Sequence, residues 1–521
     1  MTSRGGRRKG LAGWLCAGIL VCAGVMVARA ADDTATPPAQ PSDSAATPGE
    51  LNPMVTPNIE TTPNPSDNGG IPAATSGTAL PPEDETPPLP LPQPTPEATP
   101  EPAAEVEAPE DQRPLPGATS AETIANAIPL PANPALEQQF TDWDLANVES
   151  PLFLNAAIDD FGARPFLITD NLSVRTHMSL GTYYDGNIFL KSDGGNSDLI
   201  ARFAPGLTLT LGNDESIFYL MADYTVGLNY YIEHANESTA DQDFRSQFQW
   251  SLPKTVIGVN LDVSSDTGPD VDVSDRVRRT LYFGGATMTH TISDKTSWEL
   301  SGDYTRSEFA GLITSSQYEG NLFYDYEYSP KTQLGLGGGA GYLSTAGAPG
   351  QVFEQANFRT TYRATGKLTL IGQAGLDVRQ LRGMGGGDSL TPIFVLEGAW
   401  TPREGTEFAL TGQRSIYASA ILNDQNYTAT SIDVSVRQRI TDVVDVSLAV
   451  GYVNSDYTAT TTTVNATRED NYYYIRPAVE WKALSWLGVG IFYEYSEDDS
   501  TGGQASTFSR DRGGVDIAIL F

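Results

Sequence analysis

The sequence has few of the residues that build disulfides, thiol sites or metal centres. Its 521 residues include only two cysteines and three histidines. Both cysteines, Cys16 and Cys22, lie in an N-terminal segment that we predict is removed. A mature chain without cysteine has no disulfide, thiol nucleophile or cysteine metal ligand. We therefore expect no cofactor, and the fold must be held by other means.

Basic residues are also scarce. Lysine and arginine number 32 against 65 acidic residues, which gives a formal net charge of −33. Such a chain repels the phosphates of nucleic acid, and no basic patch counters this. Nucleic acid is therefore excluded as a partner.

Long apolar runs are absent outside the N-terminus. One run, residues 11–28, follows Arg7, Arg8 and Lys9 and ends at Ala28-Arg29-Ala30. A basic start, an apolar centre and an A-x-A box predict a signal peptide over residues 1–30. An uncleaved anchor is the alternative, because the run is almost long enough to span a bilayer. Its small residues and the cleavage box favour removal.

Proline is concentrated before the second half of the chain. Most of the 35 prolines lie between Pro37 and Pro134, among alanine, threonine and glutamate. This composition predicts a disordered linker over residues 31–135, either a simple spacer or a tether to envelope machinery. Residues 136–165 are richer in apolar residues. We expect a short periplasmic segment there. It should dock at the mouth of the β-barrel that the following residues predict, with insertion into the barrel lumen as the alternative.

Residues 166–521 repeat an alternating pattern of polar and apolar residues. Tyr219 to Tyr231 shows it, and period-two alternation indicates a sheet with one polar and one apolar face. A bilayer accepts such a sheet only when it closes on itself. The fold class is therefore all-β, a transmembrane antiparallel up-and-down β-barrel of about eighteen strands. We expect these strands to start near Leu172, Ala201, Phe218, Phe244, Val256, Leu281, Trp298, Tyr318, Leu334, Phe358, Leu368, Ile393, Phe408, Thr430, Val446, Tyr473, Leu487 and Gly514.

The connections alternate in length. Tight turns such as Pro253-Lys254 follow even strands, and long polar loops such as Ser264 to Asp275 follow odd ones. Short periplasmic turns and long outer loops are typical of outer-membrane barrels. Tryptophans lie beside the short turns, whereas tyrosines close the strands before long loops, which predicts two aromatic girdles. The residues are Trp250, Trp298, Trp400, Trp481 and Trp486, and Tyr230, Tyr304, Tyr342, Tyr452 and Tyr495.

A family resemblance rests on the start of this region. Tyr183-Tyr184-Asp185-Gly186-Asn187-Ile188-Phe189-Leu190, followed by Ser197-Asp198-Leu199 and Pro205-Gly206-Leu207, resembles the opening of the putative β-barrel porin 2 family. The likeness covers about residues 171–521, although Gly186 stands where the family usually has aspartate. It implies an outer-membrane barrel of a type often associated with exopolysaccharide export, and no catalytic residues.

The polar faces predict which charges line a pore. Acids dominate the earlier strands and arginines the later ones, so the two groups could face each other across the lumen and create a transverse field. The alternative is that each charge pairs with a neighbour. The predicted lining residues are Asp223, Asp262, Glu299, Asp303, Glu319, Asp325, Glu327, Arg359, Arg363, Arg379, Arg437, Arg439 and Arg476.

Other charged groups offer weaker sites. Two acid clusters in outer loops could bind a divalent cation, but a solvated anionic loop is favoured because the EF-hand spacing is missing. His177 is expected in the lumen and His234 in an outer loop, and neither forms a recognisable catalytic set. We therefore expect no enzyme. The clusters are Asp266, Asp270, Asp272 and Asp275, and Glu497, Asp498 and Asp499.

These observations favour a porin-like channel for polar solutes, with saccharide or exopolysaccharide as candidate cargo. The alternative is a non-conducting structural anchor or a surface-binding barrel tied to envelope machinery. The expected location is the outer membrane of a Gram-negative-type bacterium, with the linker in the periplasm. Expected partners are outer-membrane lipid, lipopolysaccharide and the barrel-assembly machinery, for which the terminal Phe521 is the insertion signal. Saccharide and periplasmic export proteins are further candidates, and both monomers and trimers stay open.

Overall fold

The computed structural model describes residues 166–169, 171–193, 196–212, 216–381, 388–422, 424–460, 468–502 and 507–521. The predicted signal peptide, linker and periplasmic segment (residues 1–30, 31–135 and 136–165) lie outside these residues. In the described part, no helix is long and apolar enough to cross a membrane. Within the described residues, the single helical element is the 3-10 turn η1 (Ala235–Glu237).

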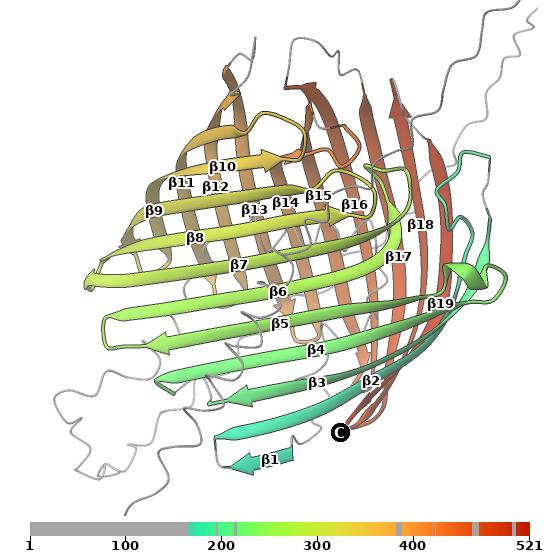
Figure 1. Ribbon diagram of the computed structural model, residues 1–521. Coiled ribbons are helices and arrows are strands. Elements are labelled where there is room, and N and C mark those ends of the chain that lie inside the picture. Colours follow the sequence, from blue (N-terminus) through green and yellow to red (C-terminus); the bar gives the residue numbers. More distant parts are fainter. Residues whose placement is uncertain are drawn as a thin grey trace, which may run out of the picture. The chain divides into compact units, whose positions relative to one another are not determined.

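The described residues form nineteen strands (Figure 1). The first ten are β1 (Phe166–Thr169), β2 (Leu172–Asp185), β3 (Asp198–Leu211), β4 (Phe218–Tyr231), β5 (Thr239–Ser251), β6 (Thr255–Asp270), β7 (Asp275–Ser293), β8 (Thr296–Phe309), β9 (Ser315–Ser329) and β10 (Thr332–Thr345). The others are β11 (Gln351–Thr365), β12 (Leu368–Leu381), β13 (Asp388–Arg403), β14 (Thr406–Ala418), β15 (Gln425–Thr441), β16 (Val444–Ala459), β17 (Glu469–Leu484), β18 (Leu487–Thr501) and β19 (Phe508–Leu520).

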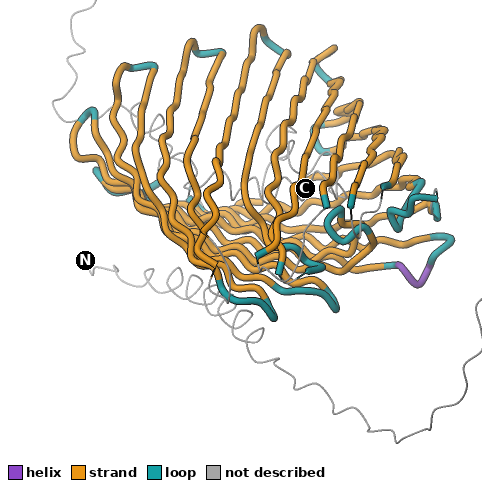
Figure 2. Tube along the Cα trace, turned by 90° about the horizontal axis from the view of Figure 1, so that it is seen from above, coloured by secondary structure: helices purple, strands orange, loops and turns teal. Residues whose placement is uncertain are grey.

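Strands β2 to β19 close into an antiparallel barrel of 18 strands, with β19 paired to β2. Each strand pairs with its neighbours in sequence, which is the up-and-down topology that the sequence predicts. Closure gives every strand of the ring a partner on both sides, as a bilayer requires. The ring is visible from the side in Figure 1 and from above in Figure 2. All eighteen predicted starts fall within these strands, in order.

The short strand β1 protects the seam of the barrel. Strand β19 pairs with β2 only as far as Leu520 opposite His177, and the N–H of Phe521 then donates to the carbonyl of Thr176. Below this point β1 takes over the edge of β2, with Phe166 opposite Val174. This hairpin covers the part of β2 that the end of β19 leaves unpaired.

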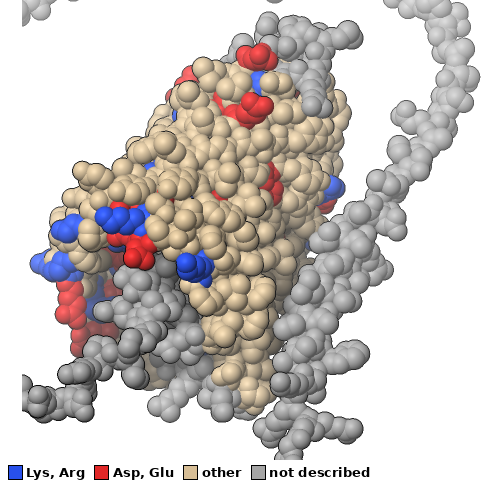
Figure 3. Space-filling view, turned by 90° about the vertical axis from the view of Figure 1, so that its left-hand side faces the viewer, with Lys and Arg blue, Asp and Glu red and all other residues tan. Residues whose placement is uncertain are grey.

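The outer face of the barrel is apolar, as expected for a surface that contacts the hydrocarbon of a bilayer. Leu336, Ile432 and Val450 are among its exposed aliphatic residues. In Figure 3, charged side chains are sparse over the middle of the wall. Trp400, Trp481 and Trp486 are exposed beside the short turns. Near the other end, the rings of Tyr304 and Tyr318 pack at a tilt, with centroids 4.9 Å apart. This distribution fits the predicted girdles.

The predicted long loops are partly wrong. Residues 264–275 were expected to be a loop, yet β6 continues to Asp270 and β7 begins at Asp275. The β8–β9 loop was likewise expected from Thr305 to Ser316, yet β8 extends to Phe309 and β9 begins at Ser315. Above the membrane both faces of a strand meet water, so the apolar alternation that marks a strand is lost while its backbone pairing continues.

Candidate functional site: the inner face and mouth of the barrel

The inner face carries the charged residues that the sequence selects. The cross-strand register places all thirteen on one face of the sheet, opposite the apolar outer face. They are Asp223 on β4, Asp262 on β6, Glu299 and Asp303 on β8, Glu319, Asp325 and Glu327 on β9, Arg359 and Arg363 on β11, Arg379 on β12, Arg437 and Arg439 on β15, and Arg476 on β17.

Most of the inner arginines are paired locally. Arg359 donates from Nη1 to Glu299 at 2.8 Å and from Nε to Asp325 at 2.9 Å, so acids and arginines meet at this part of the wall. Arg437 donates to both Asp445 at 3.0 Å and Glu480 at 3.1 Å. A cluster of guanidinium groups in a partly dry interior is costly unless carboxylates accompany it.

The expectation of two opposed, unpaired walls is therefore wrong for Arg359, Arg379, Arg437, Arg439 and Arg476, each of which has a neighbouring carboxylate. The alternative of local pairing applies instead. Asp433, on the same strand as Arg437 and Arg439, accepts from the Tyr474 hydroxyl at 2.8 Å. Among the described residues, Arg363 and Glu327 are exposed and lack a side-chain ion pair or hydrogen bond.

A stripe of glycines on β10 lets large side chains lie flat on the inner wall. Gly337 and Gly341 are on the inner face, next to Phe323 and Phe353. A Cβ on Gly337 would lie 2.4 Å from Phe323 Cδ1, and one on Gly341 would lie 2.1 Å from Phe353 Cζ. The phenyl rings occupy the space that these residues leave. Arg359 then covers the Phe323 ring, with its Cζ 4.1 Å from the ring centroid.

The β6–β7 hairpin reaches across the mouth of the barrel. Its turn, residues 271–274, contacts β16 and the start of β17, about halfway round the ring (Figure 1). Val271 packs on the apolar cluster of Leu190, Tyr472, Tyr474 and Phe508. The far wall thus holds the hairpin tip by an apolar contact as well as by polar ones.

Asp272 is the centre of the polar contacts, and its residue is only 7% exposed. Its carboxylate accepts from the Tyr457 hydroxyl at 2.7 Å and from the Ala420 N–H at 2.6 Å. Ser419 Oγ lies 3.2 Å from Oδ1 of the same carboxylate. Arg468 donates to the Asp272 carbonyl at 2.8 Å. This set of contacts, the Asp272 hub, joins the β6–β7 turn to the β14–β15 turn and to β16.

A second hairpin also narrows the mouth. It consists of the end of β14, the turn and the start of β15, and is here named the inner hairpin (residues 414–430). The register puts Ile416 and Asn426 on the outer face, yet both are buried. Asn426 exchanges hydrogen bonds with Gln351 on β11, and the Ile313 N–H donates to the Ala420 carbonyl at 3.0 Å. Both contacts show that the hairpin leans into the mouth.

This inward lean separates β13 from β14. Their pairing ends at Phe394 opposite Arg414, whereas β13 stays paired to β12 as far as Asp388. Within the described strands, residues 388–393 therefore have no backbone partner on the β14 side. A pocket lies at this split, lined by the inner faces of β9, β11 and β12 and by the ends of β13 and β14.

An aromatic row on the inner face was not foreseen. Tyr417, Tyr427 and Tyr457 lie on β14, β15 and β16, with successive ring centroids 5.4 and 5.2 Å apart. The available sequence signal was a tyrosine near the loop end of each of three successive strands. Only the register reveals that the three rings share a face.

The first acid cluster (Asp266, Asp270, Asp272 and Asp275) is paired rather than solvated, so the solvated interpretation is wrong for that cluster. Arg279 contacts Asp266 at 3.2 Å and Asp270 at 3.5 Å, and Lys191 contacts Asp275 at 2.9 Å. Burial raises the pKa of Asp270 to about 7, against the opposing effect of Arg279. In the other cluster, Asp498 accepts from Ser500. Among described residues, no group of three histidines, cysteines or acids is placed to hold a metal ion.

The two histidines lie where they were expected. His177 on the inner face bonds to Asp223 at 2.9 Å, and His234 beside η1 bonds to Asp198 at 2.9 Å. Each imidazole is thus held by one carboxylate.

A closed ring with an apolar outer face, aromatic girdles and a charged inner face defines a porin-like barrel of the outer membrane. Comparison with known families agrees: residues 393–520, from β13 to the end of β19, match the family described as "Putative beta-barrel porin 2". The resemblance first seen at residues 183–207 is thus confirmed over a different part of the barrel. A porin family also agrees with the expectation of a non-enzymatic protein.

Solved structures that match the chain include three proteins of Pseudomonas aeruginosa, one of them the outer membrane protein OpdK. OpdK is 13% identical with a TM-score of 0.38, covering 67% of this chain and 99% of its own. OccK2 is 9% identical with a TM-score of 0.40, covering 67% and 98%. The siderophore receptor PirA is 11% identical with a TM-score of 0.35, covering 69% and 81%. No curated protein matches the chain.

Proposed function

We propose that the barrel is a diffusion channel for polar solutes whose mouth is narrowed by the Asp272 hub. The carrying observation is the inner face, on which paired charges alternate with amides, hydroxyls and aromatic rings through the whole ring. An inner face of this kind stays hydrated, and an eighteen-stranded barrel is wide enough for an aqueous path. The thirteen inner charges are the proposed lining residues.

Saccharides are the proposed cargo class, including segments of an exported polysaccharide. Hydroxyl groups both donate and accept hydrogen bonds, which suits a wall that offers carboxylates, guanidinium groups and amides together. The row Tyr417–Tyr427–Tyr457 adds flat apolar surface on which a pyranose ring can pack. Lipopolysaccharide, the barrel-assembly machinery (acting on Phe521) and export proteins bound by the linker are the proposed partners.

Planar-bilayer recording of the purified protein tests the channel directly. A channel should give unitary ohmic steps that persist at low voltage. A second function, a closed anchor, is favoured by one observation: the β6–β7 tip is held across the mouth by polar and apolar contacts together. Silent protein that is correctly folded by heat-modifiable gel mobility would establish the anchor and reject the channel.

A further inference from the structure

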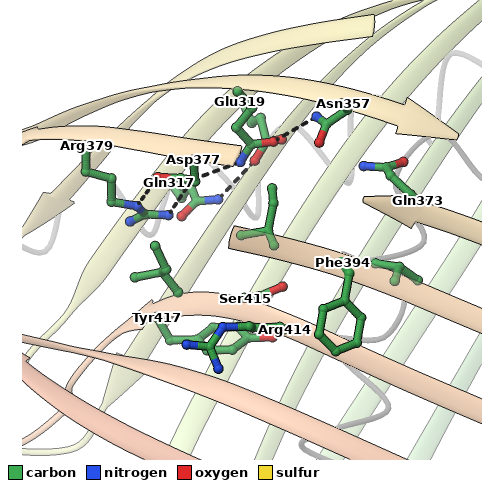
Figure 4. Close-up of a pocket in the computed structure, with 14 residues that line it drawn as sticks. Gln317, Glu319, Asn357, Gln373, Asp377, Arg379, Phe394, Arg414, Ser415 and Tyr417 are labelled. Carbon is green, nitrogen blue, oxygen red and sulfur yellow. Dashed lines mark hydrogen bonds and ion pairs between the residues drawn. The ribbon is translucent and has the colours of Figure 1, made fainter. Parts of the chain in front are cut away.

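We infer that the pocket at the β13–β14 split is a binding site for an uncharged, hydroxyl-rich ligand such as a neutral sugar unit. The inference rests on the proposed polar-solute channel and assigns one site and one ligand class within it. Figure 4 shows the pocket, with Arg379, Asp377, Gln317 and Glu319 on one side and Arg414, Ser415 and Tyr417 on the other.

The first observation is a built polar network that ends in unused hydrogen-bonding atoms. Arg379 Nε donates to Asp377 at 3.0 Å, Gln355 Nε2 donates to Asp377 at 3.0 Å, and Asn357 Nδ2 donates to Gln355 at 3.3 Å. At one end of the network, the buried Arg379 Nη1 donates no hydrogen bond. At the other end, the buried Asn357 Oδ1 accepts none. Arg379 is 3% exposed and Asn357 is 4% exposed.

The second observation comes from the opposite side of the pocket. Arg414 donates from Nη1 to Thr430, whereas its buried Nε has no partner. A buried donor or acceptor that is left unsatisfied is costly, because it has lost its hydrogen bonds to water and gained none in return. The pocket is thus surrounded by two donors and one acceptor that make no hydrogen bond. They indicate a ligand that both accepts and donates hydrogen bonds.

Charge decides the class of ligand. The pocket is lined by two carboxylates, Glu319 and Asp377, and by two guanidinium groups, Arg379 and Arg414. The two pairs balance, so the lining offers no net attraction to an anionic or a cationic ligand. Hydroxyl groups satisfy orphaned donors and acceptors alike without carrying charge. Tyr417 and Phe394 add the flat apolar surfaces on which a sugar ring can rest.

The position of the pocket suggests how a bound sugar unit relates to the route through the barrel. The Asp272 hub and the inner hairpin narrow the direct way out of the mouth, whereas the pocket lies where β13 and β14 diverge. A solute bound there is beside the wall split rather than beneath the hub. The site therefore holds a sugar unit at a lateral step on the route through the barrel.

Calorimetric titration of the full-length protein in detergent micelles tests the site. The probes are maltotriose, which is neutral, trigalacturonate, which is anionic, and the chitosan trimer, which is cationic. We expect saturable maltotriose binding, and at least tenfold weaker binding of either charged trimer. Asn357→Leu and Arg414→Met should each weaken maltotriose binding at least tenfold. Gln247→Leu, on the inner face of β5 away from the pocket, should bind normally.

Absent maltotriose binding, a preference for a charged trimer, or unchanged binding by both pocket variants would each overturn the inference. Heat-modifiable mobility of each variant confirms that a loss of binding is not a loss of folding. The channel proposal fails separately: maltotriose binding by a protein that conducts no current would support the site and reject the channel.

Discussion

The Asp272 carboxylate accepts a hydrogen bond from the Tyr457 hydroxyl at 2.7 Å, although the two residues are 185 apart in sequence and belong to opposite sides of the ring. The β6–β7 turn carries Asp272 over the mouth, and β16 presents Tyr457 from the inner face. Because both side chains are buried, this one contact links the conformation of a hairpin to the width of the mouth.

Removing the hub carboxylate should release the β6–β7 tip. Asp272→Ala deletes the acceptor of the Ala420 and Tyr457 hydrogen bonds. A hydrogen bond to a charged group contributes about 1.5–3 kcal/mol, so the ratio of closed to open mouth should fall about thirtyfold or more. Single-channel recording should show fewer closures and a higher mean current. Asp275→Ala, whose partner Lys191 is exposed, is the matched control. Equal gating in both variants would remove the hub from the mechanism.

The hub should also respond to pH through Asp270, which lies outside the membrane-spanning part of β6. Burial raises the pKa of Asp270 to about 7 in the docked hairpin, against 3.8 for the free side chain. A raised pKa means that the docked state binds a proton more tightly. Docking should therefore weaken as the pH rises from 3.8 to about 7, because the undocked carboxyl ionises first, and it should change little above 7, where Asp270 is ionised in both states.

The measurement is the closed fraction in bilayers from about pH 4 to about pH 8, which should decrease as the pH rises to about 7 and then level off. Asp270→Asn should flatten this dependence. Burial also raises the pKa of Asp498 to about 7, so Asp498→Asn is the necessary control. If flattening appears with Asp498→Asn alone, the titrating group belongs to β18 and not to the β6–β7 hairpin.

The two faces of β15 should differ in their tolerance of charge. Val434 is 47% exposed on the outer face, and Ser435 lies next to it on the inner face between Ala409 and Ala449. Val434→Arg places a charge in hydrocarbon and should cost about 2–4 kcal/mol at mid-membrane. Ser435→Arg should assemble nearly normally. Heat-modifiable mobility of outer-membrane fractions reports assembly, and similar yields of the two variants would contradict the assigned faces.

The repeating pattern of the sequence is sufficient for the strands but not for the mouth. Period-two alternation is a local signal, so it locates β2 to β19 and the inner face of each one, including all thirteen predicted charges. The Asp272 hub depends on contacts between residues such as Asp272 and Arg468, which are 196 apart in sequence. Neither residue carries a local signature. The sequence therefore placed Asp272 in a solvated acid cluster, since the residues that bind its carboxylate belong to segments far away in the chain.

The carboxylate partners of the inner arginines could not be predicted from the sequence for a related reason. Arg437 and Asp445 are near in sequence, but Glu480 reaches Arg437 only because β16 and β17 pair in one register. A shift of one residue would send either side chain to the lipid. Sequence composition suggested separate acidic and basic walls, whereas the cost of leaving guanidinium groups unpaired in the interior favours mixed clusters.

Ion selectivity should follow the balance within such a cluster. Asp445 and Glu480 together accept from Arg437, and Arg439 contacts Asp445 at 3.5 Å. Replacing both arginines with serine leaves two carboxylates without these partners, so the lumen gains negative charge close to the ion path. Reversal potentials under a salt gradient should shift toward cation selectivity, with conductance changed modestly. Asp445→Asn makes the opposite change and should shift selectivity toward anions. A reversal potential that moves in neither variant would mean that current does not pass along this wall, and it would leave the closed anchor as the better account of the barrel.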